Sequence, residues 1–113
     1  MKITKKTETF ERKNSDKCIV TEYPSLAEDM DFAQVTISGR YPEALYAVNT
    51  RCKEMVYIHS GTGQVEVNGV IHPLDAGDVV LIDAGEKFCW DGNMTLFITC
   101  RSAFDVEQHC LVG

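Results

Sequence analysis

The chain has 113 residues, 44% of them hydrophobic, which allows one domain with an ordinary core and leaves little room for a second module. Its formal net charge of −6 disfavours nucleic-acid binding, because neutralising phosphates requires a basic face. No apolar run approaches the roughly 20 residues of a membrane-spanning helix, so we expect neither a nucleic-acid nor a membrane partner.

The N-terminal segment, residues 1–17, is charged and polar, and we interpret it as a solvated tail. A secretory signal would need an apolar stretch there, so the sequence predicts a cytoplasmic protein. From residue 18 onward, β-favouring runs alternate with turn residues, which predicts one all-β domain over residues 18–113. The expected strands are 18–23, 32–38, 44–49, 54–60, 63–69, 70–74, 77–82, 86–90 and 94–100.

One hairpin is specified by its turn residues. Asn68-Gly69 stands between two valines, and a two-residue type I′ turn needs positive φ at both central positions. Pairing the flanking valines puts Val65 opposite His72.

Other turns follow from composition. Residues 83–85 and 91–93 contain the Asp, Gly and Asn typical of turns. Helix is scarce: residues 24–31 and 103–109 are long enough for a turn or two, with Asp105 as the cap of the second.

Two expected strands, residues 55–58 and 79–82, are apolar on both faces, whereas a sheet with one solvated face would alternate. Something must therefore cover their outer side. The N-terminal segment and a second subunit are the two candidates, and we predict a homodimer.

Five cysteines form an odd set without a C-x-x-C pair, at positions 18, 52, 89, 100 and 110. This count argues against a disulfide framework and against a zinc knuckle. We expect most of them to be small buried apolar residues.

Two glycine-containing motifs resemble those of the cupin family. In the first cupin motif a glutamate follows two histidines and precedes a glycine, and Glu54 and Gly61 have that spacing. The glycines of the second motif match Gly77 and Gly85. The resemblance covers roughly residues 33–102 and implies a double-stranded β-helix, or jelly-roll barrel.

The metal ligands of that family do not carry over. The metal-binding cupins hold a transition metal through two motif-one histidines, the glutamate and a motif-two histidine. The aligned positions here are Ala47, Asn49, Glu54 and Phe88, or Val48 and Thr50 for the first two with a shorter gap. One carboxylate and one amide beside a phenyl ring make a poor site, so we expect no metal and no cofactor.

The predicted ligand-binding residues are Asn49, Glu54, Phe88 and Trp90. Phe88 takes the place of a metal ligand, and Trp90 extends an aromatic wall along the same strand face. A buried Glu54 would have a raised pKa and serve as a general base or a hydrogen-bond acceptor.

Structural roles are expected for several other polar residues. Arg40 and Tyr41 would close one end of the cavity. His109 could fold back over the barrel mouth, but a surface helical turn is the default expectation for it. His59 has the opposite strand parity to Glu54 and should face outward. Cys52 has no histidine nearby in sequence to activate it and is expected to be a buried or idle thiol.

The favoured hypothesis is a metal-free barrel that binds or senses an unidentified small molecule. A metal-independent isomerase or epimerase using Glu54 is the first alternative, and a metalloenzyme with an atypical ligand set, using Glu54, Cys52 or a histidine, is another. A pure oligomerisation module would need no pocket. Fold alone does not decide among them.

Overall fold

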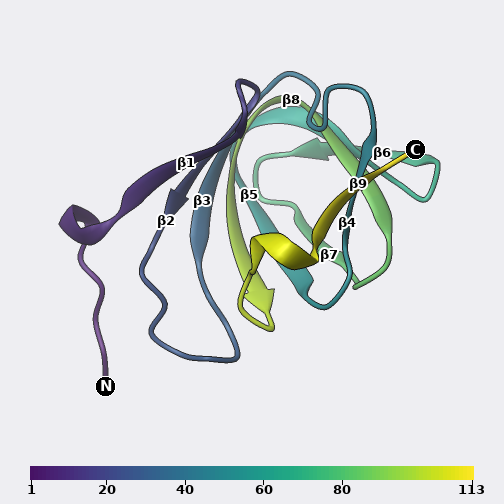
Figure 1. Ribbon diagram of the computed structural model, residues 1–113. Helices are drawn as coiled ribbons and strands as arrows, with labels where there is room; N and C mark the ends of the chain where they lie inside the picture. The colour runs from purple at the N-terminus through teal and green to yellow at the C-terminus, as the bar shows by residue number, and fades with distance from the viewer.

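A single antiparallel sheet of nine strands curls into a barrel in the computed structural model, which describes residues 1–113 (Figure 1). This architecture confirms the all-β, jelly-roll prediction. The strands are β1 (Phe10–Ser15), β2 (Cys18–Glu22), β3 (Ala33–Ser38), β4 (Tyr46–Asn49), β5 (Lys53–Val67), β6 (Val70–Asp75), β7 (Val79–Ile82), β8 (Lys87–Arg101) and β9 (His109–Val112). Two 3-10 helices, η1 (Lys6–Glu8) and η2 (Val106–Gln108), complete the fold, and no helix is long and apolar enough to cross a membrane.

The long strands β5 and β8 are the central pair of the barrel, and they pair along almost their whole length. Each has 15 residues and merges two of the expected strands. The predicted turn at residues 91–93 is therefore wrong. Gly92 has φ +135°, and a Cβ there would lie 2.5 Å from the Cα of Gly63. The glycine thus permits a close approach within a bent strand instead of a chain reversal.

The Asn68-Gly69 hairpin is confirmed. Both residues have positive φ, +49° and +84°, and Val65 pairs with His72. Asp105 also acts as predicted, since its side chain accepts a hydrogen bond from the backbone N–H of Glu107 at the start of η2. The expected helical turn at residues 24–31 is wrong, because that segment is an irregular loop.

Strand β1 lies within the segment expected as a polar tail. It pairs with β2 in antiparallel register, and the Arg12 guanidinium forms an ion pair of 2.7 Å with Glu22. The strand is a polar sheet edge without a buried residue, which explains why its composition resembles that of a solvated tail.

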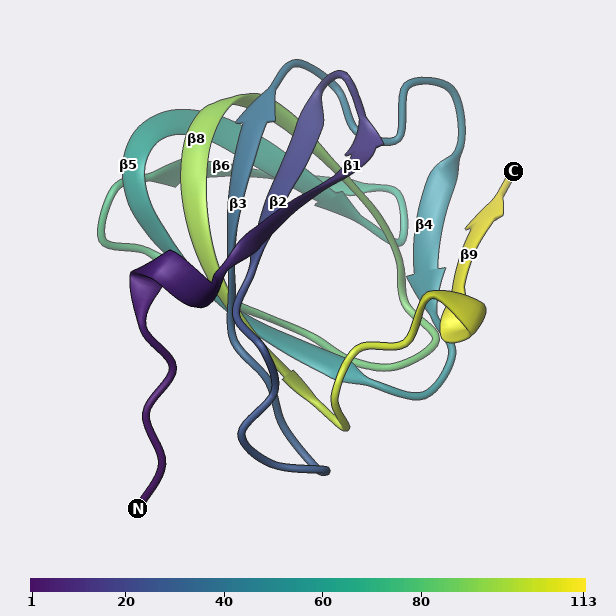
Figure 2. The same cartoon turned by 60° about the vertical axis from the view of Figure 1, so that its left-hand side comes forward.

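The chain end also joins the sheet, because β9 pairs with β4 (Figure 2). The core inside the barrel comes from strands β2, β3, β5, β7 and β8 and their neighbours, and its 19 buried residues end at Cys100. Four of the five cysteines are buried, and all five are free thiols. The barrel wall therefore consists of the core strands together with β9, which extends the sheet next to β4.

The outer side of β5 and β7 is apolar and uncovered. Met55 and Tyr57 on β5 are 54% and 42% exposed, and Val79 and Leu81 on β7 are 61% and 49% exposed. The N-terminal segment does not cover this face, since β1 extends the sheet beyond β2 and β3. The homodimer stays a prediction.

We expect light scattering at micromolar concentration to give a mass about twice the 12.6 kDa of one chain. Tyr57→Lys should shift the protein to monomer, because it places a charge in the centre of the apolar face. Glu43→Lys, a loop substitution away from β5 and β7, is the control. A wild-type monomer would contradict the prediction.

A second prediction concerns the contact between β5 and β8. Gly63→Ala should lower the free energy of unfolding by about 2–3 kcal/mol, because its Cβ would lie 2.4 Å from the backbone oxygen of Asp91. Gly85→Ala has open space and only an unfavourable φ, so it should cost about 1 kcal/mol. Urea unfolding measures both, and equal losses would refute the steric explanation.

Candidate functional site

A cavity of about 60 Å³ lies inside the barrel and opens to solvent at a mouth. A cavity of this volume has room for a reactive group, while the remainder of a small molecule would extend toward solvent. The lining residues are Arg12, Asn14, Cys18, Val20, Glu22, Asp31, Ala33, Val35, Tyr41, Glu54, Phe88, Trp90, Ile98, Cys100, Phe104 and His109.

Phe88 and Trp90 form one wall of this cavity. Both are nearly fully buried, and their rings meet edge to face with centroids 6.3 Å apart. Phe88 pairs with Ala47 on β4, and the backbone of Trp90 exchanges two hydrogen bonds of 2.8 Å with Tyr41. The predicted aromatic face therefore borders the hollow and also packs as part of the core.

Glu54 is a buried carboxyl group in the cavity, 6% exposed. Its Oε1 accepts a hydrogen bond of 2.7 Å from Nδ2 of Asn49. Burial raises the pKa of Glu54 to about 7; the bond from Asn49 opposes this rise and the negative charge of Asp31 adds to it. Glu54 therefore exchanges its proton near neutral pH.

His109 and Tyr41 face the same cavity. The pairing of β4 with β9 places His109 opposite Asn49, and its Nδ1 lies 2.8 Å from Asn49 Oδ1. Its Nε2 lies 3.0 Å from the hydroxyl of Tyr41, and the two rings are parallel. Burial lowers the pKa of His109, with a further contribution from Arg12, and burial raises the pKa of Tyr41 to about 12.

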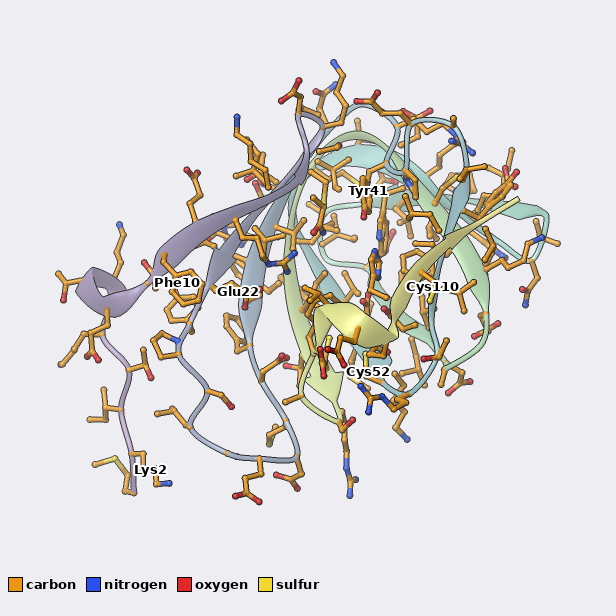
Figure 3. All side chains as sticks on the ribbon, in the orientation of Figure 1. Lys2, Phe10, Glu22, Tyr41, Cys52 and Cys110 are labelled. Atoms are coloured by element: carbon orange, nitrogen blue, oxygen red, sulfur yellow. The ribbon has the colours of Figure 1, made fainter.

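The mouth of the cavity lies beside the β1–β2 hairpin. The Arg12 guanidinium stacks 5.0 Å above the Phe104 ring and also bonds to Glu22. Asp31 fixes the neighbouring chain, because its carboxylate accepts the backbone N–H groups of Cys100 at 3.0 Å and Phe104 at 2.7 Å. Figure 3 shows Tyr41 and Cys52 toward opposite ends of the barrel and Glu22 on β2.

The positions aligned with cupin metal ligands do not fit a transition metal. Asn49 and Glu54 are already bonded to each other, and Phe88 offers no donor atom. No group of three or more His, Cys, Asp or Glu side chains is arranged to hold a metal ion.

The structure brings three of the four predicted site residues to the cavity, namely Glu54, Phe88 and Trp90. Asn49 is 1% exposed and does not line it, but contacts Glu54 and His109 from behind. The default expectation of a surface helical turn for His109 is wrong, because β9 holds it against the barrel, as in the alternative in which it folds back.

Tyr41 is also more than an end cap, since its hydroxyl reaches His109 inside the hollow. His59 is exposed as predicted. Cys52 is fully buried, and a hydrogen bond with Cys100 lowers its pKa. Neither thiol is therefore presented to solvent as a nucleophile.

Comparisons with known proteins identify a matching family and several solved structures with a similar fold. Residues 42–98 match the family model described as the cupin domain. No curated protein sequence matches the chain.

Several solved structures share the fold. Pac13 from Streptomyces, described as a nucleoside dehydratase and also solved with uridine, superposes with a TM-score of 0.88 and 19% identity, covering 99% of this chain and 91% of that one. KdgF from Halomonas sp. gives 0.75 and 12% identity, covering 95% and 98%. An RmlC-like cupin from Shewanella frigidimarina gives 0.71 and 17%, covering 89% and 90%.

Stability should depend on pH through Glu54. Its pKa is higher in the folded chain, so between pH 4.5 and about 7 the folded state binds more protons than the unfolded state. The stabilisation is complete below pH 4.5 and is lost as pH rises to about 7, a total of about 3 kcal/mol.

Glu54→Gln removes this proton exchange and keeps an acceptor for Asn49. The difference in free energy of unfolding between the variant and the wild type, from urea titrations at pH 4.5, 6 and 7.5, should change by that amount. A difference that is constant with pH would show that Glu54 is not a buried proton-binding group.

Proposed function

The chain belongs to the cupin family, and from that premise we propose that its barrel binds a small hydroxylated molecule and eliminates water from it by acid–base chemistry without a metal ion. One observation carries the proposal. Two proton-exchanging groups, Glu54 and the His109–Tyr41 pair, border one cavity, and Asn49 connects them from behind. Their pKa values are displaced in the directions that leave a large fraction of Glu54 protonated and His109 neutral near pH 7.

The two groups suit the two halves of an elimination. The His109–Tyr41 pair accepts a proton from a carbon beside an electron-withdrawing group, and the C–H electron pair forms the new double bond. The neighbouring C–O bond breaks as Glu54 gives its proton to the departing hydroxyl, so the products are the unsaturated compound and water. Solvent then returns the proton from His109 to the Glu54 carboxylate.

The shape of the cavity limits the substrate. The cavity of about 60 Å³ admits a small polar end of a molecule, and Arg12 and Phe104 among its lining residues offer a surface for a larger planar part. The similarity to Pac13, which has been solved with uridine, supports a nucleoside as the first class to test. Because the two sequences are only 19% identical, the similarity supports a shared fold and guides the choice of the first compound to test.

Ligand binding without chemistry is a second candidate. Ten of the 16 lining residues are hydrophobic, and the Phe88–Trp90 wall would hold a planar ring in a carrier or sensor as well as in an enzyme. Turnover distinguishes this candidate from the dehydratase.

We expect uridine to alter the fluorescence of Trp90, the single tryptophan, and a panel of nucleosides and their oxidised derivatives to include a compound that loses the mass of one water molecule. Glu54→Gln should lower turnover at least about 100-fold while uridine binding persists, because it removes the acid but keeps the hydrogen-bond acceptor. Turnover in the wild type should fall above about pH 7 as Glu54 loses its proton.

Glu43→Gln, an exposed loop carboxyl, is the matched control and should behave as wild type. Uridine binding with no turnover of any compound would favour the carrier or sensor. Equal turnover in wild type and Glu54→Gln would refute the acid role, and absence of both binding and turnover would refute the nucleoside class.

A further inference from the structure

Gln108 lies outside the cavity, 2% exposed, and its orientation is fixed by the main chain. The backbone N–H groups of Arg51 and Cys52 point at its Oε1 from 3.1 and 3.2 Å. A backbone N–H can only donate, so the oxygen of the Gln108 amide must face these two groups. The Nε2 of Gln108 is thereby turned toward Asn49, where it donates to Oδ1 over 3.1 Å.

This contact sets the orientation of the next amide. Asn49 must present its oxygen to Gln108, so its Nδ2 faces Glu54. The same Asn49 oxygen lies 2.8 Å from Nδ1 of His109. Two acceptors at this distance would repel, so His109 carries its proton on Nδ1.

The tautomer of His109 in turn determines the direction of its hydrogen bond with Tyr41. With Nδ1 protonated, the Nε2 of a neutral imidazole is an acceptor, and the Tyr41 hydroxyl donates to it over 3.0 Å. The hydroxyl proton is therefore occupied, and the oxygen of Tyr41 keeps its lone pairs for the cavity that it lines.

We propose that Gln108 is a positioning residue: through Asn49 and His109 it fixes the direction of the hydrogen-bond chain, so that Tyr41 offers the cavity a hydrogen-bond acceptor and an entry point for a proton. The catalytic use of this arrangement rests on the dehydratase proposed above; the direction of the chain does not.

Proton transfer follows this direction. When the Tyr41 oxygen accepts a proton from the substrate, its own O–H bond breaks and that proton joins His109 Nε2. The resulting imidazolium still donates from Nδ1 to Asn49 Oδ1. At the other side, Glu54 uses only Oε1 as an acceptor for Asn49, so a proton on Oε2 is available to the cavity. A bound molecule therefore meets an acceptor at Tyr41 and a donor at Glu54.

Two-bond ¹H–¹⁵N NMR correlations of the histidine rings test the direction in the wild type without any substrate. We expect His109 to carry its proton on Nδ1 at pH 7.5. A proton on Nε2 would overturn the proposal, whatever the protein catalyses.

Gln108→Glu should reverse the direction of the hydrogen-bond chain. Its carboxylate still accepts from Arg51 and Cys52, but the second oxygen is now an acceptor, so the Asn49 amide should rotate and turn Nδ2 toward it and toward His109. The proton of His109 should move to Nε2, and kcat should fall at least tenfold with little change in KM. An unchanged Nδ1 proton in a folded variant would overturn the role of Gln108.

Asn49→Asp is the second variant, because a carboxylate offers acceptors alone and should keep the proton on Nδ1. Glu107→Gln, an exposed neighbour on η2, is the matched control and should leave both tautomer and turnover unchanged. If the tautomer moves as expected while no compound is turned over by any variant, the direction of the chain stands and the dehydratase proposal fails.

Discussion

The burial of one carboxyl group, Glu54, imposes a chain of requirements on the rest of the barrel. A carboxyl group removed from water needs a hydrogen-bond partner, and Asn49 supplies it. Asn49 is itself buried, so its oxygen needs donors, which come from Gln108 and His109. All of these hydrogen-bonding needs are met, because no buried side-chain nitrogen or oxygen in the molecule lacks a hydrogen-bond partner. The polar interior is therefore a connected network that constrains every member.

That network explains why the chain end folds back onto the barrel. Gln108 and His109 belong to the last segment, and the β4–β9 pairing brings them beside Asn49. The short β9 contributes exposed and half-buried side chains, so apolar burial holds it only weakly. Its backbone ladder and the polar contacts behind Glu54 hold it in place. The β4–β9 pairing thus extends the barrel wall and at the same time places Gln108 and His109 beside Asn49.

Local patterns predicted most of the fold and one side of the site. Alternation of apolar residues, the Asn68-Gly69 turn and the glycine spacing indicated a jelly-roll barrel, and strand parity placed Phe88 and Trp90 together. The missing part depended on long-range pairing: His109 lies 60 residues from Asn49 and 68 from Tyr41 in the sequence. No local periodicity in a four-residue strand indicates such partners. The polar edge strand β1 was missed for a related reason, since it buries too little to alternate.

The apolar core and part of the polar network occupy different stretches of the chain. The buried apolar cluster ends at Cys100, whereas Gln108 and His109 stand close to Gly113. Removal of residues 105–113 would spare every residue of the apolar cluster and delete both donors to the Asn49 oxygen, while the bond between Asn49 and Glu54 would remain. A substitution at Gln108 or His109 would therefore change the polar network without altering any side chain of the apolar cluster.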